Sequence, residues 1–106
     1  MTNQTPIEYI SLVKTVAYVL KKRHWTFAAV ESCTGGWLSK VCTDQPGSST
    51  WFDCGFVTYS NQSKQDLVNV SKKTLNTYGA VSEQTAIEMA HGGLAHSSAD
   101  MSVAIT

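Results

Sequence analysis

The chain has 106 residues, of which 42% are hydrophobic and 15% charged, and this composition predicts one soluble globular domain rather than a disordered protein. Eight basic and eight acidic residues give a formal net charge of zero, so the composition provides no overall attraction to nucleic acid or to an anionic membrane. Three cysteines without a CxxC pair predict reduced thiols in a cytoplasmic protein, and no apolar run is long enough to span a membrane.

The first expected element is a helix that begins at residues 5–8 (Thr-Pro-Ile-Glu), a pattern typical of a capping box with proline at the first helical position. Apolar residues then recur at the spacing of one buried helical face, and the helix is expected to end near Arg23. An apolar strand over 26–30 follows, then a loop of small residues over 31–36 and a helix over 37–43. Strand, loop and helix in this order are the first half of a βαβ unit.

The rest of the chain continues the alternation of strands and helices. The expected elements are a turn over 44–47, a strand over 54–59, helices over 61–69 and 71–78, a helix capped by Ser82 that runs to about residue 97, and a strand over 101–106. This order predicts a three-layer α/β/α sandwich around a largely parallel or mixed sheet. Because the chain ends inside an expected core strand, we expect residues 1–106 to be a single domain that is truncated at its C-terminus.

The loop over 31–36 (Glu-Ser-Cys-Thr-Gly-Gly) is the first candidate binding element. Its backbone N–H groups would lie at a helix N-terminus and at the carboxyl end of a strand, where phosphate groups often bind. Thr34, Gly35 and Gly36 are therefore candidate contacts for a phosphate. The alternative is an ordinary helix cap, which the local pattern by itself favours over a phosphate site.

Two serines, Ser48 and Ser49, follow a Pro-Gly turn, and Tyr59 and Lys64 follow the next expected strand. Local composition favours a simple turn at the serines. A serine nucleophile needs a base, however, and a lysine with a depressed pKa can replace the histidine of a Ser-His-Asp triad.

Other side chains are weaker candidates for nucleophile, base or metal ligand. His91 and His96 are five residues apart on one expected helix and do not share a face, which disfavours a metal pair, while His24 lies at a helix end. Cys33 is a possible nucleophile because thiols at helix N-termini are activated, but no histidine partner is indicated for it.

Four motifs of the chain resemble the CinA C-terminal-domain family and occur in the order of that family. They are residues 29–36 (AVESCTGG), 46–49 (PGSS), 55–61 (GFVTYSN) together with Lys64, and 78–82 (YGAVS). The resemblance extends from about Ile7 to Thr106, with Val30 at a position where alanine is common. Family domains continue past the last expected strand, which also indicates an incomplete domain.

The resemblance implies an amidohydrolase that converts nicotinamide mononucleotide to nicotinic acid mononucleotide and ammonia, in pyridine nucleotide recycling. It implies Ser49 as nucleophile and Lys64 as base, with Tyr59 and Ser32 as further active-site residues and Ser48 as a substrate contact or alternative nucleophile. No metal or cofactor is implied, and the expected partners are a small-molecule nucleotide and further copies of the chain, as a dimer or larger homo-oligomer.

Two other functions are open at this point. One is a nucleotide-binding paralogue without catalytic activity, or an inactive fragment. The other is DNA binding, which the competence-related name of the family suggests but which the neutral charge and the lack of a basic stripe disfavour.

Overall fold

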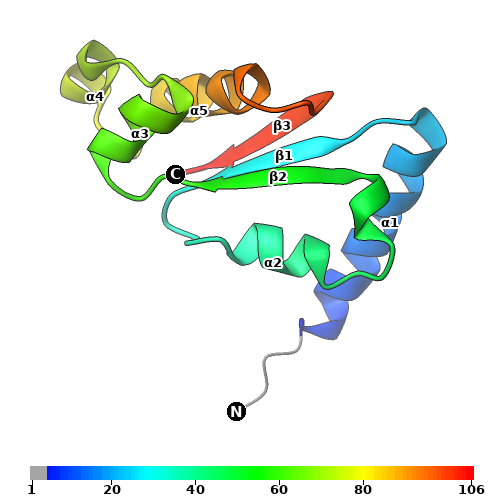
Figure 1. Cartoon of the computed structure of the whole chain (residues 1–106). Helices are drawn as coiled ribbons and strands as arrows, with labels where there is room; N and C mark the ends of the chain where they lie inside the picture. Colours follow the sequence, from blue (N-terminus) through cyan, green and yellow to red (C-terminus); the bar gives the residue numbers. More distant parts are fainter. Residues whose placement is uncertain (1–4) are drawn as a thin grey trace.

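A computed structural model describes residues 5–106 of the chain. Its elements are α1 (Ile7–Arg23), β1 (Phe27–Glu31), α2 (Trp37–Thr43), the short 3-10 helix η1 (Ser48–Thr50), β2 (Phe52–Val57), α3 (Asn61–Val68), α4 (Lys72–Tyr78), α5 (Glu83–Ala95) and β3 (Met101–Ile105). The sheet forms the middle layer, with α1 and α2 on one face and α5 on the other, while α3 and α4 pack beside α5 near the carboxyl ends of the strands (Figure 1). The predicted three-layer α/β/α architecture is therefore confirmed.

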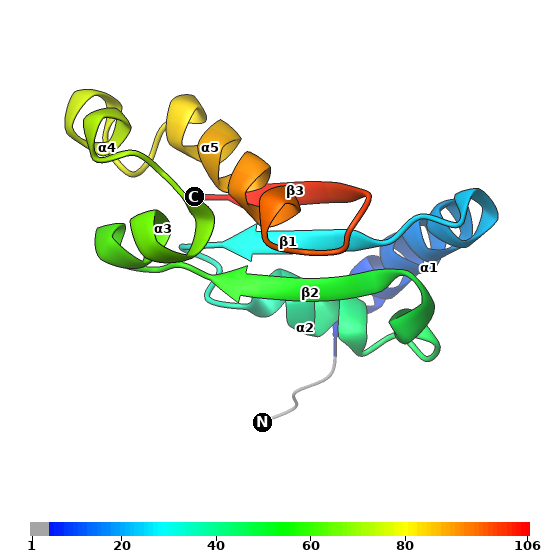
Figure 2. The same cartoon turned by 45° about the horizontal axis from the view of Figure 1, so that its top comes forward.

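The sheet contains three parallel strands in the order β2-β1-β3, and all three point the same way (Figure 2). β1 is the central strand, and all five of its residues are buried, as expected for a strand covered by helices on both faces. In the register of the sheet, Glu31 at the end of β1 lies beside Val57 of β2 and Ile105 of β3. The carboxyl ends of all three strands therefore meet at one edge of the sheet.

Two hydrophobic clusters hold the helices against the sheet. The cluster on the α1 and α2 face contains Val13, Ala17, Leu20, Phe27, Ala29, Val41, Cys42 and Trp51. The cluster on the α5 face contains Val30, Val68, Val70, Leu75 and Met89. Consecutive residues of a strand point to opposite faces, which is why Ala29 and Val30 of β1 belong to different clusters.

Glycine allows α5 to approach its neighbours closely. A Cβ atom at Gly92 would lie 1.8 Å from the carbonyl oxygen of Val68, the last residue of α3. A Cβ atom at Gly93 would lie 2.5 Å from a side-chain methyl group of Val30. The distance between α3 and α5 therefore depends on the absence of a side chain at position 92.

Serine caps begin three of the helices, and the predicted cap at Ser82 is confirmed. Ser60, Ser71 and Ser82 each accept a hydrogen bond from the backbone N–H three residues later. The predicted capping box of α1 is wrong, because Thr5 donates its hydroxyl proton to Asp44 instead of capping the helix. β2 begins and ends two residues before the predicted strand, since Ser60 already caps α3.

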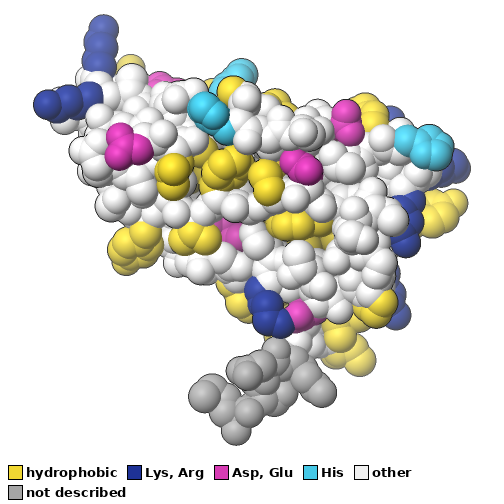
Figure 3. Space-filling view, viewed as in Figure 1, with side chains coloured by type: hydrophobic (Ala, Val, Ile, Leu, Met, Phe, Trp, Pro, Cys, Tyr) yellow, Lys and Arg dark blue, Asp and Glu magenta, His cyan; other side chains and the backbone are white. Residues whose placement is uncertain are grey.

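The surface drawn in Figure 3 is chemically mixed. Lysine and arginine side chains lie at the margins of this face, and no continuous basic stripe crosses it. Among residues 5–106, no helix is both long and apolar enough to cross a membrane.

Candidate active site

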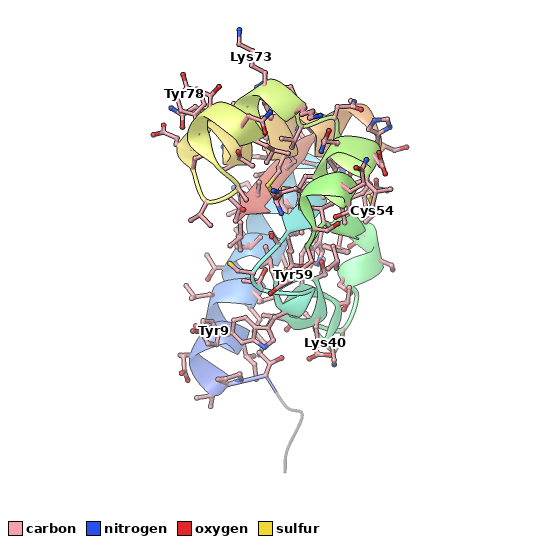
Figure 4. All side chains as sticks on the ribbon, turned by 90° about the vertical axis from the view of Figure 1, so that its left-hand side faces the viewer. Tyr9, Lys40, Cys54, Tyr59, Lys73 and Tyr78 are labelled. Carbon is pink, nitrogen blue, oxygen red and sulfur yellow. The ribbon has the colours of Figure 1, made fainter. Side chains whose placement is uncertain are left out.

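Ser32 and Lys64 meet at the carboxyl edge of the sheet, the edge that faces the viewer in Figure 4. Ser32 directly follows β1, and Lys64 lies in the first half of α3, which follows β2. The Lys64 Nζ atom donates hydrogen bonds to Ser32 Oγ over 3.1 Å and to the Tyr59 carbonyl oxygen over 2.9 Å. The Lys64 side chain is only 1% exposed, and Ser32 is also buried. The structure thus forms a buried serine–lysine pair.

Burial lowers the pKa of Lys64 below its ordinary value, and the nearby Cys33 opposes this shift only in part. A lower pKa increases the fraction of neutral amine, which is the form that can accept a proton. Lys64 is therefore chemically suited to act as a base toward Ser32.

Backbone N–H groups without partners lie directly after Ser32. In the described part of the chain, the amides of Cys33, Thr34 and Gly36 make no hydrogen bond, whereas the Gly35 amide donates to the Ser32 carbonyl oxygen. Gly35 and Gly36 have φ values of 61° and 101°, a left-handed conformation that favours glycine. The loop can therefore expose amides beside a serine oxygen, as an oxyanion hole requires.

The Glu31 side chain occupies part of the predicted phosphate-binding region at the start of α2. The Glu31 carboxylate accepts hydrogen bonds from the Leu38 and Ser39 amides and from the Thr34 hydroxyl. Leu38 and Ser39 belong to the first turn of α2, whose amides would otherwise attract an external anion. A carboxylate of the chain therefore occupies these two helix amides, and the expected phosphate contacts of Thr34, Gly35 and Gly36 stay a prediction.

Ser48 and Ser49 lie at the opposite edge of the sheet from Lys64. Both belong to η1, which precedes β2, whereas Lys64 follows β2. β2 has six residues, and a strand rises about 3.3 Å per residue, so its first and last residues are about 17 Å apart. The expected contact between Ser49 and Lys64 is therefore absent within one chain, and a catalytic role of Ser49 stays a prediction.

Tyr59 contributes its backbone rather than its phenol to the pair. Its carbonyl oxygen accepts the second Lys64 hydrogen bond, while its side chain is 73% exposed and lies near the centre of the view in Figure 4. The phenol oxygen has no hydrogen-bond partner among residues 5–106. The expected role of Tyr59 in proton relay therefore stays a prediction, and its contact with the pair is through the main chain.

The remaining candidates lie apart from the pair or have no partner for catalysis. Cys33 is exposed next to Ser32, and Cys42 is buried, which together with the charge of Glu31 raises its thiol pKa to about 11. His96 contacts Asn69. No group of three or more His, Cys, Asp or Glu side chains that could hold a metal ion occurs within residues 5–106.

Sequence reasoning missed the role of Glu31. A signal was present, since Glu31 ends an apolar strand and precedes a loop into a helix, where an acidic group is favoured by the helix dipole. This sequence pattern does not indicate that the Glu31 carboxylate is buried.

The chain is similar to known proteins over most of its length. The family model for the CinA C-terminal domain matches residues 10–106. Nicotinamide-nucleotide amidohydrolase PncC of Escherichia coli K12 is 48% identical over 102 residues, which cover 96% of this chain and 62% of that protein. The protein of the same name from Enterobacter agglomerans is 50% identical over 91 residues, which cover 86% of this chain and 56% of that protein.

A solved structure also matches. The crystal structure of competence/damage inducible protein CihA from Agrobacterium tumefaciens superposes with a TM-score of 0.95 at 40% identity, over 99% of this chain and 64% of that one. The chain thus spans less than two thirds of the length of these relatives.

Proposed function

Since the chain belongs to the family of CinA C-terminal domains, we propose that it is an amidohydrolase that converts nicotinamide mononucleotide to nicotinic acid mononucleotide and ammonia. The observation that carries this proposal is the hydrogen bond between Lys64 Nζ and Ser32 Oγ inside the protein. The PncC relatives, which are named as nicotinamide-nucleotide amidohydrolases, support the choice of substrate. A cytoplasmic location and a homo-oligomeric assembly, both expected from the sequence, are part of the proposal.

In the proposed mechanism, Ser32 Oγ attacks the carboxamide carbon while its proton moves to Lys64 Nζ. Free amides of Cys33 and Thr34 stabilise the oxyanion, and one such donor contributes about 10²- to 10³-fold in kcat. The C–N bond breaks, Lys64 returns the proton to the departing ammonia, and the acyl group stays on Ser32 as an ester. Lys64 then deprotonates a water molecule, which hydrolyses the ester and restores Ser32. No step needs a metal or a cofactor.

The geometry favours Ser32 over Ser49 as the nucleophile. Ser32 Oγ already accepts a hydrogen bond from the proposed base, whereas Ser49 lies beyond the other end of β2. Within the proposed mechanism Ser49 could reach Lys64 only from a second copy of the chain. The two assignments therefore differ in which variants should lose activity and in whether two inactive variants can complement each other.

The test measures ammonia and nicotinic acid mononucleotide released from nicotinamide mononucleotide by the wild type and three variants. Ser32→Ala and Lys64→Met should each lower kcat by about 10³-fold or more, and Ser49→Ala should stay close to wild type. Retained activity in Ser32→Ala with loss in Ser49→Ala would reverse the assignment. In that case, activity recovered by mixing Ser49→Ala with Lys64→Met would show that two copies share a site.

A further outcome concerns the substrate rather than the residues. If the wild-type chain binds nicotinamide mononucleotide but does not hydrolyse it, the amidohydrolase proposal is wrong, and a nucleotide-binding paralogue is the better description.

A further inference from the structure

Glu31 is a fully buried carboxylate (0% exposed) at the end of the central strand, and both of its oxygens are used. Oε1 accepts hydrogen bonds from the Thr34 hydroxyl over 2.7 Å and the Leu38 amide over 2.9 Å. Oε2 accepts from the Ser39 amide over 2.9 Å and the Ser39 hydroxyl over 2.7 Å. Four donors from the following loop and helix therefore converge on this one side chain.

Within residues 5–106, no cationic side chain forms an ion pair with this buried carboxylate. The only ion pair among residues 5–106 joins Lys40 to Asp44, on the exposed side of α2. Burial by itself would raise the pKa of Glu31, but the hydrogen bonds from Ser39, Thr34 and Leu38 outweigh it and lower the pKa. Glu31 is therefore held as an anion by neutral donors alone.

A helix start does not require such an arrangement. α3, α4 and α5 each begin with a serine cap that lies directly before the helix. The N-cap residue of α2 is Gly36, which has no side chain to cap the helix, and Glu31 from the other end of the loop caps it instead. The two ends of the loop over 32–36 are thereby tied together, although two of its residues are left-handed glycines.

This loop carries the groups of the proposed mechanism. Adjacent strand residues point to opposite faces of a sheet, so Glu31 contacts α2 while Ser32 contacts Lys64 on α3. Among residues 5–106, Glu31 makes no hydrogen bond with Ser32 Oγ or Lys64 Nζ, and it is not among the causes of the lowered Lys64 pKa. Its hydrogen bonds go to the loop and to α2, so it can influence the reaction through the placement of the loop.

We propose that Glu31 is a positioning residue of the hydrolysis. Its carboxylate fixes the loop over 32–36, so that Ser32 Oγ stays hydrogen-bonded to Lys64 Nζ and the Cys33 and Thr34 amides stay beside Ser32 Oγ. This inference rests on the proposed function, and in particular on Ser32 as the nucleophile. Loss of the Glu31 hydrogen bonds should loosen the alignment of nucleophile, base and oxyanion donors. Misplacement of such groups by about 1 Å can lower the rate about 100-fold.

The test compares Glu31→Gln with the matched control Glu88→Gln. Glu88 is the second carboxylate that accepts hydrogen bonds at a helix start. Its donors are the amide of Ser71, which caps α4, and the hydroxyl of Thr74 in the first turn of α4. It lies outside the proposed site, so the control should lose stability but keep its kcat per folded molecule. Glu31→Gln should lower kcat about 10- to 100-fold with KM changed by less than about threefold.

The pH dependence separates positioning from a change in the base. Burial and Cys33 are the causes of the shifted Lys64 pKa, and Glu31 is not among them. The acid limb of kcat/KM should therefore keep its midpoint in Glu31→Gln while its plateau falls. A kcat equal to that of Glu88→Gln would overturn the inference.

A second readout avoids the substrate altogether. The rate at which a fluorophosphonate labels Ser32 should fall in Glu31→Gln and stay unchanged in Glu88→Gln. If the wild type reacts no faster than Ser32→Ala, the proposed nucleophile is wrong, whereas equal labelling of wild type and Glu31→Gln overturns only the positioning role. Should Glu31→Gln not fold, Thr34→Val combined with Ser39→Ala removes two of the four donors and should lower the labelling rate several-fold; an unchanged rate would equally overturn the role.

Discussion

Replacing Gly92 with alanine tests whether α5 and α3 are in direct backbone contact. The added Cβ atom would lie 1.8 Å from the Val68 carbonyl oxygen, and a separation of at least about 3.0 Å requires the two helices to move apart by about 1.2 Å. The obstacle is backbone, so no side-chain rotation relieves it, and we assign a cost at the upper end of overpacking, about 3 kcal/mol. Alanine is favoured over glycine inside a helix by about 1 kcal/mol. The net expectation is a loss of about 2 kcal/mol.

Urea and thermal unfolding measure this loss, which corresponds to a decrease in Tm of roughly 10 °C for a domain of this size. His91→Ala is the control, because it places alanine at the exposed neighbouring position of α5 and should change stability by less than about 0.5 kcal/mol. The sign of the change in unfolding free energy shows whether the clash or the helix propensity prevails. A Gly92→Ala variant as stable as the wild type, or more stable, would mean that helix propensity prevails and that α3 and α5 do not touch at Val68.

Three further predictions concern the site. Burial lowers the pKa of Lys64, so kcat/KM should rise with pH as the neutral amine forms, with a midpoint below the ordinary lysine value of 10.5; a rate that falls over that range would contradict Lys64 as base. Burial and the charge of Glu31 raise the pKa of Cys42 to about 11, so iodoacetamide at pH 8 should label exposed Cys33 first and Cys42 only after unfolding, as peptide mapping can check. Tyr59→Phe should keep kcat within about twofold because only the Tyr59 carbonyl touches Lys64, and a large loss would restore the phenol relay.

The order of the elements could be predicted because it depends on local signals. Strand-length apolar runs, the Ser82 cap and the helical spacing of apolar residues are all readable in short windows of sequence, and the structure confirms them. The failure of the capping box at Thr5 has a tertiary cause, because its hydroxyl binds Asp44 of another element. Local patterns cannot show such a competing partner.

The topology of the parallel sheet determines which serine lies close to Lys64. Ser49 and Lys64 are close in sequence, but six strand residues separate them in space, whereas Ser32 and Lys64 are distant in sequence and come from the same edge of a parallel sheet. In such a sheet ligands gather at the carboxyl ends, so a residue that precedes a strand lies on the wrong edge. The predicted parallel order of the strands is enough to place Ser49 and Lys64 at opposite ends of the sheet, whereas no sequence pattern indicates that the Glu31 side chain is buried.

The parallel pairing of β1 has a consequence for how the protein is made. Phe27 pairs with Phe52 of β2, only 25 residues later, but with Met101 of β3, 74 residues later, and closing the longer loop costs about 1 kcal/mol more in chain entropy. At a synthesis rate of about 5–20 residues per second, one edge of β1 stays open on the ribosome for several seconds after β2 is complete. The Ser32 amide donates a hydrogen bond to the Ile105 carbonyl oxygen, so this backbone contact of the serine forms only when β3 docks. Chains that end before β3 should therefore hold Ser32 less firmly than chains that include it, and under the proposed function they should hydrolyse nicotinamide mononucleotide more slowly.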